Sequence, residues 1–252
     1  SEKEKGEGER KILTEISYPK FWEEFGRNIR LGLIEDGTNR ARLTKLIRYK
    51  SSKSDDKYVS LEDYRDRMDE KQKNIYYITG ESIDKIKQLP VLEDAVKKNV
   101  EVLFMTDAID EYVVGHLTDF DGKKLVNLAK EPVEGDESDR EKKVDAKRKE
   151  KYEPLLKWCK ELLGESVTKV ALTKRLTNEA VLLTSPQHGV TARLAQIMKG
   201  QALGERGGEA DAKRILELNH LHPIVDELFK RVTANEKDPV ASDIALVLFD
   251  TA

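Results

Sequence analysis

The sequence contains a single cysteine, Cys159, so a framework of disulfides within the chain is excluded. Only 6% of its 252 residues are aromatic and 38% are hydrophobic, which predicts small cores. No apolar run approaches the roughly 18 residues of a membrane-spanning helix. Neither sign of charge dominates, since 45 Lys and Arg are interleaved with 48 Asp and Glu. We therefore expect no membrane span and no basic face for nucleic acid.

Motifs for catalysis and nucleotide binding are also missing. The sequence has no G-x-x-x-x-G-K-[ST] and no G-x-G-x-x-G, the glycine-rich loops that cradle phosphates. His220 and His222 have no carboxylate or thiol at recognised ligand spacing, and we interpret them as loop residues beside Pro223. Cys159 has no evident base and is interpreted as a small buried apolar residue. We expect no catalytic residue, metal site or cofactor in this chain, although a pocket of perturbed ionisable groups would revive an α/β enzyme.

Charged residues are abundant instead, at 37% of the chain. A dense mixed-charge run at 134–151 is typical of a solvated helix face with i,i+4 pairs. The acids Asp107, Asp110 and Glu111 lie at the expected start of a helix. Because acids near a helix start favour its positive dipole end, we interpret this cluster as structural rather than catalytic.

Hydrophobic periodicity predicts an α/β fold, α+β overall. Strand-like runs alternate with helical stretches, which is typical of a small sandwich layer built on a parallel sheet. The predicted segments are a disordered tail at 1–15, a helical segment at 16–72, a small α/β/α layer with a long connecting helix at 73–164, and a mixed α/β unit at 165–252. Both ends look unfinished, so we expect a chain cut from a longer protein.

The stretch 189–203, GVTARLAQIMKGQAL, is the strongest candidate for function. Val190, Leu194, Ile197 and Met198 recur at helical spacing between flexible glycines. Such a one-sided helix without acid–base groups suits binding of apolar surface. The alternative is an ordinary helix whose apolar side faces the core.

Longer motifs along nearly the whole chain resemble the ninety-kilodalton heat-shock chaperones, the heat shock protein 90 family. FWEEFG, GLIED and EPLLKW are most similar to the endoplasmic-reticulum branch of that family. The motifs that carry the resemblance are FWEEFGRNIRLG at 21–32, SLEDY at 60–64, KNIYYITGES at 73–82, EVLFMTD at 101–107, IDEY at 109–112, FDGKKL at 120–125 and QIMKGQAL at 196–203.

The resemblance implies a fragment: the latter part of the middle domain and much of the carboxy-terminal domain. The nucleotide site, with its ATP and Mg²⁺, belongs to an amino-terminal domain outside this piece, so the fragment is not expected to be an enzyme. The resemblance also implies client proteins and co-chaperones as partners, and a homodimer in the full-length protein. It implies a location in the endoplasmic reticulum, with the cytoplasm as the alternative.

In this family the helix within 189–203 carries apolar residues exposed toward clients, and the matching positions here are Val190, Leu194 and Met198. The family commonly has Trp at the first and Met at the second, and the loop 204–208 also departs from the family sequence. The implied function is to bind client proteins and to couple ATPase motion to the dimer. The alternative is a purely structural lever, with clients held elsewhere.

Overall fold

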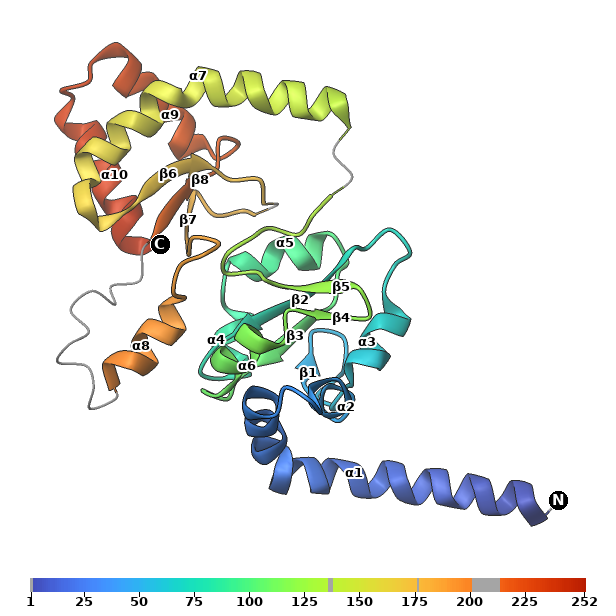
Figure 1. Ribbon diagram of the computed structural model, residues 1–252. Coiled ribbons are helices and arrows are strands. Elements are labelled where there is room, and N and C mark those ends of the chain that lie inside the picture. The colour runs from blue at the N-terminus through green and yellow to red at the C-terminus, as the bar shows by residue number, and fades with distance from the viewer. Residues whose placement is uncertain (1, 136–137, 176, 201–213) are drawn as a thin grey trace. The chain divides into compact units, whose positions relative to one another are not determined.

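The computed structural model describes residues 2–135, 138–175, 177–200 and 214–252 (Figure 1). The chain divides into two compact units, residues 1–86 with 101–126 and residues 87–100 with 127–252. Helices and strands occur in both units, which confirms the predicted α/β class. This division differs from the four segments expected above, because 87–100 groups with the later part of the chain, and those segment boundaries stay predictions.

The first unit is built on a five-stranded sheet with the order β1-β3-β2-β5-β4. Strands β2 and β3 run parallel, and Tyr76 lies opposite Val102. Its elements are α1 (Glu2–Glu35), α2 (Arg40–Thr44), β1 (Lys50–Ser51), α3 (Leu61–Arg67), β2 (Asn74–Thr79), α4 (Ile83–Lys87), β3 (Val102–Met105), α6 (Asp110–His116), β4 (Asp119–Phe120) and β5 (Lys123–Asn127).

The sheet is mixed, whereas the sequence pattern predicts a parallel one. Strand β1 pairs antiparallel with β3, and β4 pairs antiparallel with β5. Every residue of β2 and β3 is buried. Continuous burial explains why these central strands read as apolar and aromatic runs instead of alternating patterns.

Two helix starts in this unit compare directly with the sequence. The sequence SLED at 60–63 predicts a capping box at the start of α3. The structure confirms it, since Ser60 Oγ accepts the Asp63 N–H at 3.0 Å and Asp63 accepts the Ser60 N–H at 2.8 Å. Helix α1 begins at Glu2, where a disordered tail is expected at 1–15. The start of α1 is rich in Glu and Lys, which have good intrinsic helix propensity, and the expectation of a tail did not weigh this.

The second unit contains a three-stranded sheet with the order β6-β8-β7, in which β8 is parallel to β6 and antiparallel to β7. Its elements are α5 (Val91–Lys97), α7 (Asp139–Leu163), the 3-10 turn η1 (Gly164–Ser166), β6 (Lys169–Leu172), β7 (Val181–Thr184), α8 (Ala192–Gly200), β8 (Ile215–Leu218), α9 (Pro223–Ala234) and α10 (Pro239–Thr251).

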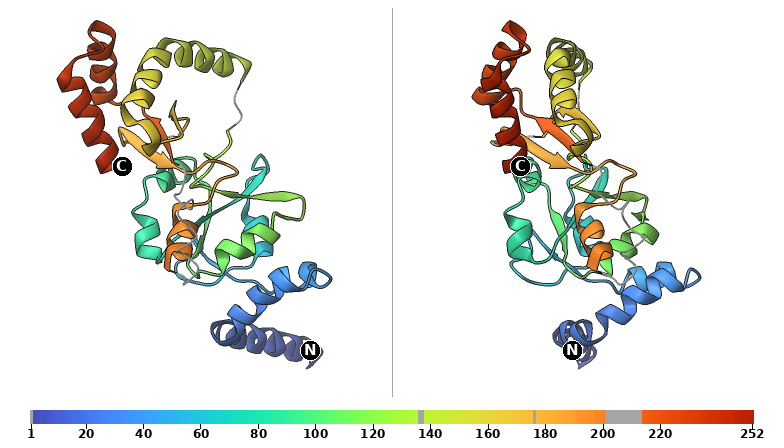
Figure 2. Two further views of the ribbon diagram at one scale, coloured as in Figure 1. Left: turned by 60° about the vertical axis from the view of Figure 1, so that its left-hand side comes forward. Right: turned by 90° about the vertical axis from the view of Figure 1, so that its left-hand side faces the viewer.

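Helices α7, α9 and α10 share one core with the strands of this sheet (Figure 2). Leu155 of α7, Leu216 of β8 and Leu228 of α9 are among its fully or almost fully buried members. The 25-residue helix α7 starts at a capping box of Ser138 and Glu141. It ends before Gly164, whose φ of 53° suits glycine, so the predicted long helix is confirmed. The helix lies within the second unit, and its role as a connection between domains stays a prediction.

Candidate functional site

Helix α8 begins with a side-chain cap that the sequence analysis missed. The Thr191 hydroxyl accepts the Leu194 N–H at 3.0 Å, and the Ala195 N–H donates to the Thr191 carbonyl at 3.0 Å. A threonine directly before an apolar helical run is a recognised N-cap signal, so the sequence could have revealed it. The cap fixes where the helix starts and therefore which residues share a face.

The segment that leads into α8 is attached to an earlier loop of the same unit. The Ser185 N–H donates to the Ala129 carbonyl at 2.9 Å, and the Lys130 ammonium donates to the Gln187 carbonyl at 3.3 Å. The Gln187 amide also donates to the Glu131 carboxylate at 3.2 Å. These contacts fix the approach to the helix, while α8 itself lies apart from the three-stranded sheet in Figures 1 and 2.

The three predicted client-binding residues differ in exposure. Met198 is 38% exposed, whereas Val190 and Leu194 are partly buried. Leu194 and Met198 are one helical turn apart on α8 and therefore share a face. Val190 lies outside the helix, directly before the Thr191 cap. Within α8 the described side chain that is buried is Ala195, at 4% exposure.

The chemistry around α8 suits binding. Among the described positions of α8, Met198 is an exposed large apolar side chain, and Ala192 and Gln196 are exposed beside it. Gln196 pairs locally, since its side chain accepts from Arg193 at 3.3 Å. Among the described residues, no group of three or more His, Cys, Asp or Glu could hold a metal ion. The loop 204–208, whose role the sequence leaves open, lies outside the described residues.

The cysteine and the two neighbouring histidines have structural surroundings. Burial raises the pKa of the Cys159 thiol to about 12, so it is a poor nucleophile at neutral pH. His222 caps α9 by accepting the Ile224 N–H at 3.3 Å. His220 lies against Tyr152, with ring centroids 6.2 Å apart, and burial lowers the pKa of its imidazole.

The acidic cluster at the start of α6 is tied into the core of the first unit. Asp110 is fully buried, and its carboxylate lies 2.8 Å from Nε of Arg30 and accepts the Tyr49 hydroxyl at 3.1 Å. It also accepts the Asp107 N–H at 3.1 Å. Burial raises the pKa of Asp110 to about 6, against the opposing effect of the Arg30 charge. The helix begins at Asp110 itself, within the acidic cluster where the sequence pattern predicts a helix start.

Comparison with known proteins identifies the family to which the chain belongs. The family profile described as "Hsp90 protein" matches residues 2–252. The chain therefore belongs to the Hsp90 protein family, and the resemblance drawn from its motifs is confirmed.

Within that family the chain is similar to endoplasmin homologs. It is 57% identical over 242 residues to the endoplasmin homolog of Leishmania donovani and to that of Leishmania infantum. Each alignment covers 95% of this chain but only 31% of the relative. The chain therefore spans about a third of the length of these relatives. No helix in the described part of the chain has the length and apolarity to cross a membrane.

Proposed function

We propose that this chain is part of an ATP-dependent chaperone and holds client proteins through the apolar surface of Val190, Leu194 and Met198. ATP and Mg²⁺ bind elsewhere in the longer protein, and the chain passes motion from that site to a carboxy-terminal dimer. Clients and co-chaperones are its partners, in the endoplasmic reticulum. Membership of the Hsp90 family and similarity to endoplasmin homologs support this proposal.

The observation that carries the proposal is the exposure of Met198 on a capped helix, one turn from Leu194. Fully burying one such side chain is worth roughly 1.5–3 kcal/mol. Two or three of them, each covered in part, give weak binding that does not depend on a deep pocket. Methionine also adapts its shape to different partners, which suits clients of varied sequence.

The test is suppression of aggregation of a heat-denatured enzyme, with the chain carrying Leu194→Ser and Met198→Ser. We expect protection to fall several-fold, because both changes remove apolar area from one helix face. The matched control is Leu246→Ser with Val247→Ser on α10, since these side chains are 42% and 60% exposed. The control variant should protect the enzyme nearly as well as the parent chain. An equal loss of protection in both double variants would contradict the proposal, because it would show that any exposed apolar residue contributes.

The competing function is a lever without client contacts, and helix α7 favours it. A 25-residue helix with a capping box at one end and a terminal glycine at the other is a stiff element for passing motion. Under that function the Leu194 and Met198 changes would leave aggregation untouched. In the full-length protein, the Leu194 and Met198 changes should leave ATP turnover intact under either function. Suppression of client aggregation is therefore the measurement that distinguishes client binding from a lever.

The expectation that this chain holds no nucleotide site has its own test. We propose that the purified chain neither hydrolyses ATP nor dimerises tightly, because both properties depend on other parts of the longer protein. Nucleotide turnover that copurifies with the chain would contradict the first statement. A tight dimer in sedimentation velocity would contradict the second.

A further inference from the structure

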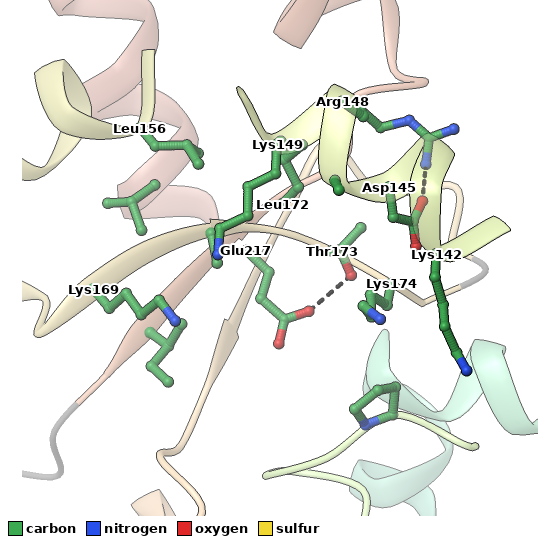
Figure 3. A pocket seen from close by; sticks show the side chains of 15 residues that line it. Lys142, Asp145, Arg148, Lys149, Leu156, Lys169, Leu172, Thr173, Lys174 and Glu217 are labelled. Carbon is green, nitrogen blue, oxygen red and sulfur yellow. Dashed lines mark hydrogen bonds and ion pairs between the residues drawn. The ribbon is translucent and has the colours of Figure 1, made fainter. Parts of the chain in front are cut away.

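The second unit contains a cavity of about 490 Å³ that the proposed function does not use (Figure 3). Its volume lies within the range of roughly 300–1,000 Å³ that is usual for small-molecule sites. The walls come from α7, from β6 with the residues after it, and from β8. The residues that line it are Pro132, Lys142, Asp145, Ala146, Arg148, Lys149, Leu156, Lys169, Val170, Ala171, Leu172, Thr173, Lys174, Ile215 and Glu217.

One part of the lining is apolar. Leu156 and Val170 are buried, and Leu172 and Ile215 are partly buried. Val170 and Leu156 also belong to the core of the unit, so this wall is anchored to the packed interior. The wall can therefore receive an aliphatic or aromatic body without rearranging.

The two acids of the lining are already compensated by their neighbours. Asp145 accepts from Arg148 at 2.5 Å. Glu217 accepts the Thr173 hydroxyl at 2.7 Å and the Thr184 hydroxyl at 2.9 Å, and the first of these contacts is drawn in Figure 3. Neither carboxylate is left to repel an anion.

A buried cation lies behind Glu217. Arg175 has no exposed side-chain surface, and its Nε lies 3.4 Å from the Glu217 carboxylate. Its two terminal nitrogens make no hydrogen bond in the described part of the chain. The guanidinium charge therefore balances the Glu217 carboxylate, so this wall carries no net negative charge.

Two lysines add positive charge at the rim. Lys149 and Lys169 have no ion-pair or hydrogen-bond partner in the part of the chain that the structure describes. The charge of Lys149 contributes to lowering the pKa of Glu153, but the ion pair of Glu153 is with Lys157, at 2.9 Å. In Figure 3 the ammonium groups of Lys149 and Lys169 are turned toward the cavity from α7 and β6.

We propose that this cavity binds a small amphipathic anion, whose carboxylate or phosphate head lies between Lys149 and Lys169 and whose apolar body lies along Leu156, Leu172 and Ile215. Charge and shape select this class together. An inorganic anion would leave the apolar wall in water, and an uncharged lipid would leave the two ammonium groups without a partner.

The test is titration of the 252-residue chain with dodecanoate and with dodecyl phosphate, both below their critical micelle concentrations, by calorimetry and amide NMR. Saturable binding with shifts in β6, β8 and the first half of α7 is expected for at least one probe. Lys149→Glu with Lys169→Glu should weaken it by about tenfold, since each of these exposed charges contributes modestly. Lys147→Gln removes a charge from the same helix outside the lining and should leave the affinity unchanged.

A second variant tests the apolar part of the cavity. Ala146 lines it from the exposed side of α7, so Ala146→Trp should fill the space and abolish binding while circular dichroism stays native. Dodecanol, which has the same body without the charge, should bind about tenfold more weakly than dodecanoate. Equal binding of dodecanol, insensitivity to the Lys149 and Lys169 changes, absence of saturable binding, or binding of anionic vesicles alone would each overturn the proposal.

Discussion

Helices α8 and α9 have the same kind of amphipathic sequence but opposite surroundings. In α9 the residues Val225, Leu228 and Val232 are 0%, 1% and 3% exposed and belong to the core of their unit. In α8 the apolar positions are partly buried at Leu194 and 38% exposed at Met198. Both helices are short and each has a side-chain cap. Helical periodicity therefore shows that an apolar face exists, and the rest of the fold decides whether that face is buried.

The largest expected effect is a difference in unfolding free energy between core variants of α9 and matching variants of α8. Leu228→Ala in α9 should cost about 2–5 kcal/mol of unfolding free energy, because it leaves a cavity in the core. Leu194→Ala in α8 should cost about 1 kcal/mol or less, since part of that side chain already contacts water. Urea unfolding followed by Trp158 fluorescence in a Trp22→Phe background reports on the second unit. Similar losses for both variants would show that α8 is a core helix like α9.

The next prediction extends the comparison to α6, a helix whose buried side carries charge. The folded-state pKa of Asp110 is about 6 against an ordinary 3.8, because burial disfavours the carboxylate. The folded state therefore holds the proton more strongly, and the stability of the first unit should fall as pH rises from about 4 to about 6. The linked free energy is at most about 3 kcal/mol.

This pH dependence is measurable by urea unfolding through Trp22, whose ring faces Arg30 at 4.8 Å, in a Trp158→Phe background. Asp110→Asn should flatten the profile over the same pH interval. The Glu111→Gln variant provides a neighbouring acid as control. Parallel profiles for the parent and Asp110→Asn would contradict the assignment.

A smaller effect concerns the cap of α8. Thr191→Ala removes the oxygen that accepts the Leu194 N–H and should destabilise the helix by about 1 kcal/mol. Amide exchange within 192–198 should then speed up about fivefold, while the unfolding midpoint of the unit changes little. Thr191→Ser retains the acceptor and should preserve the exchange rates. Loss of the whole unit's stability with Thr191→Ala would show that α8 folds as part of the core.

The smallest effect is chemical and leaves stability unchanged. Cys159 lies on the buried side of α7, and burial raises the pKa of its thiol to about 12. In the folded chain a disulfide reagent at pH 8 should therefore react only as fast as the unit opens, and in urea it should react at once. Rapid labelling of the native chain would show that the core beneath α7 is more open than that of α9.

Most of the fold could be predicted because its central elements have strong local signals. The apolar runs of β2 and β3, the capping box of α3 and Pro223 at the start of α9 correspond directly to elements of the structure. The two-residue strands β1 and β4 could not be predicted, since so short a segment has no period of its own. Their pairing depends on β3 and β5, which lie elsewhere in the sequence.

The sites were harder to predict than the fold, because they depend on side chains brought together from separate segments. Glu217, inside an otherwise apolar strand, is the one local sign of the cavity beside α7. Its partners Thr173, Thr184 and Arg175 are all more than thirty positions away. For α8 the sequence supplies the apolar face and its family resemblance, and the structure adds the exposure of Met198.

Site-specific photocrosslinking tests the role of α8 most directly. A benzophenone amino acid is placed at Met198, which is 38% exposed, or at Val247 of α10, a more accessible apolar control at 60%. The chain is then mixed with a chemically denatured enzyme or with its native form. We predict strong crosslinks from position 198 to the denatured enzyme, few to the native one, and few from position 247. Absence of crosslinks from position 198, or equal yields from both positions, would contradict client binding by this helix.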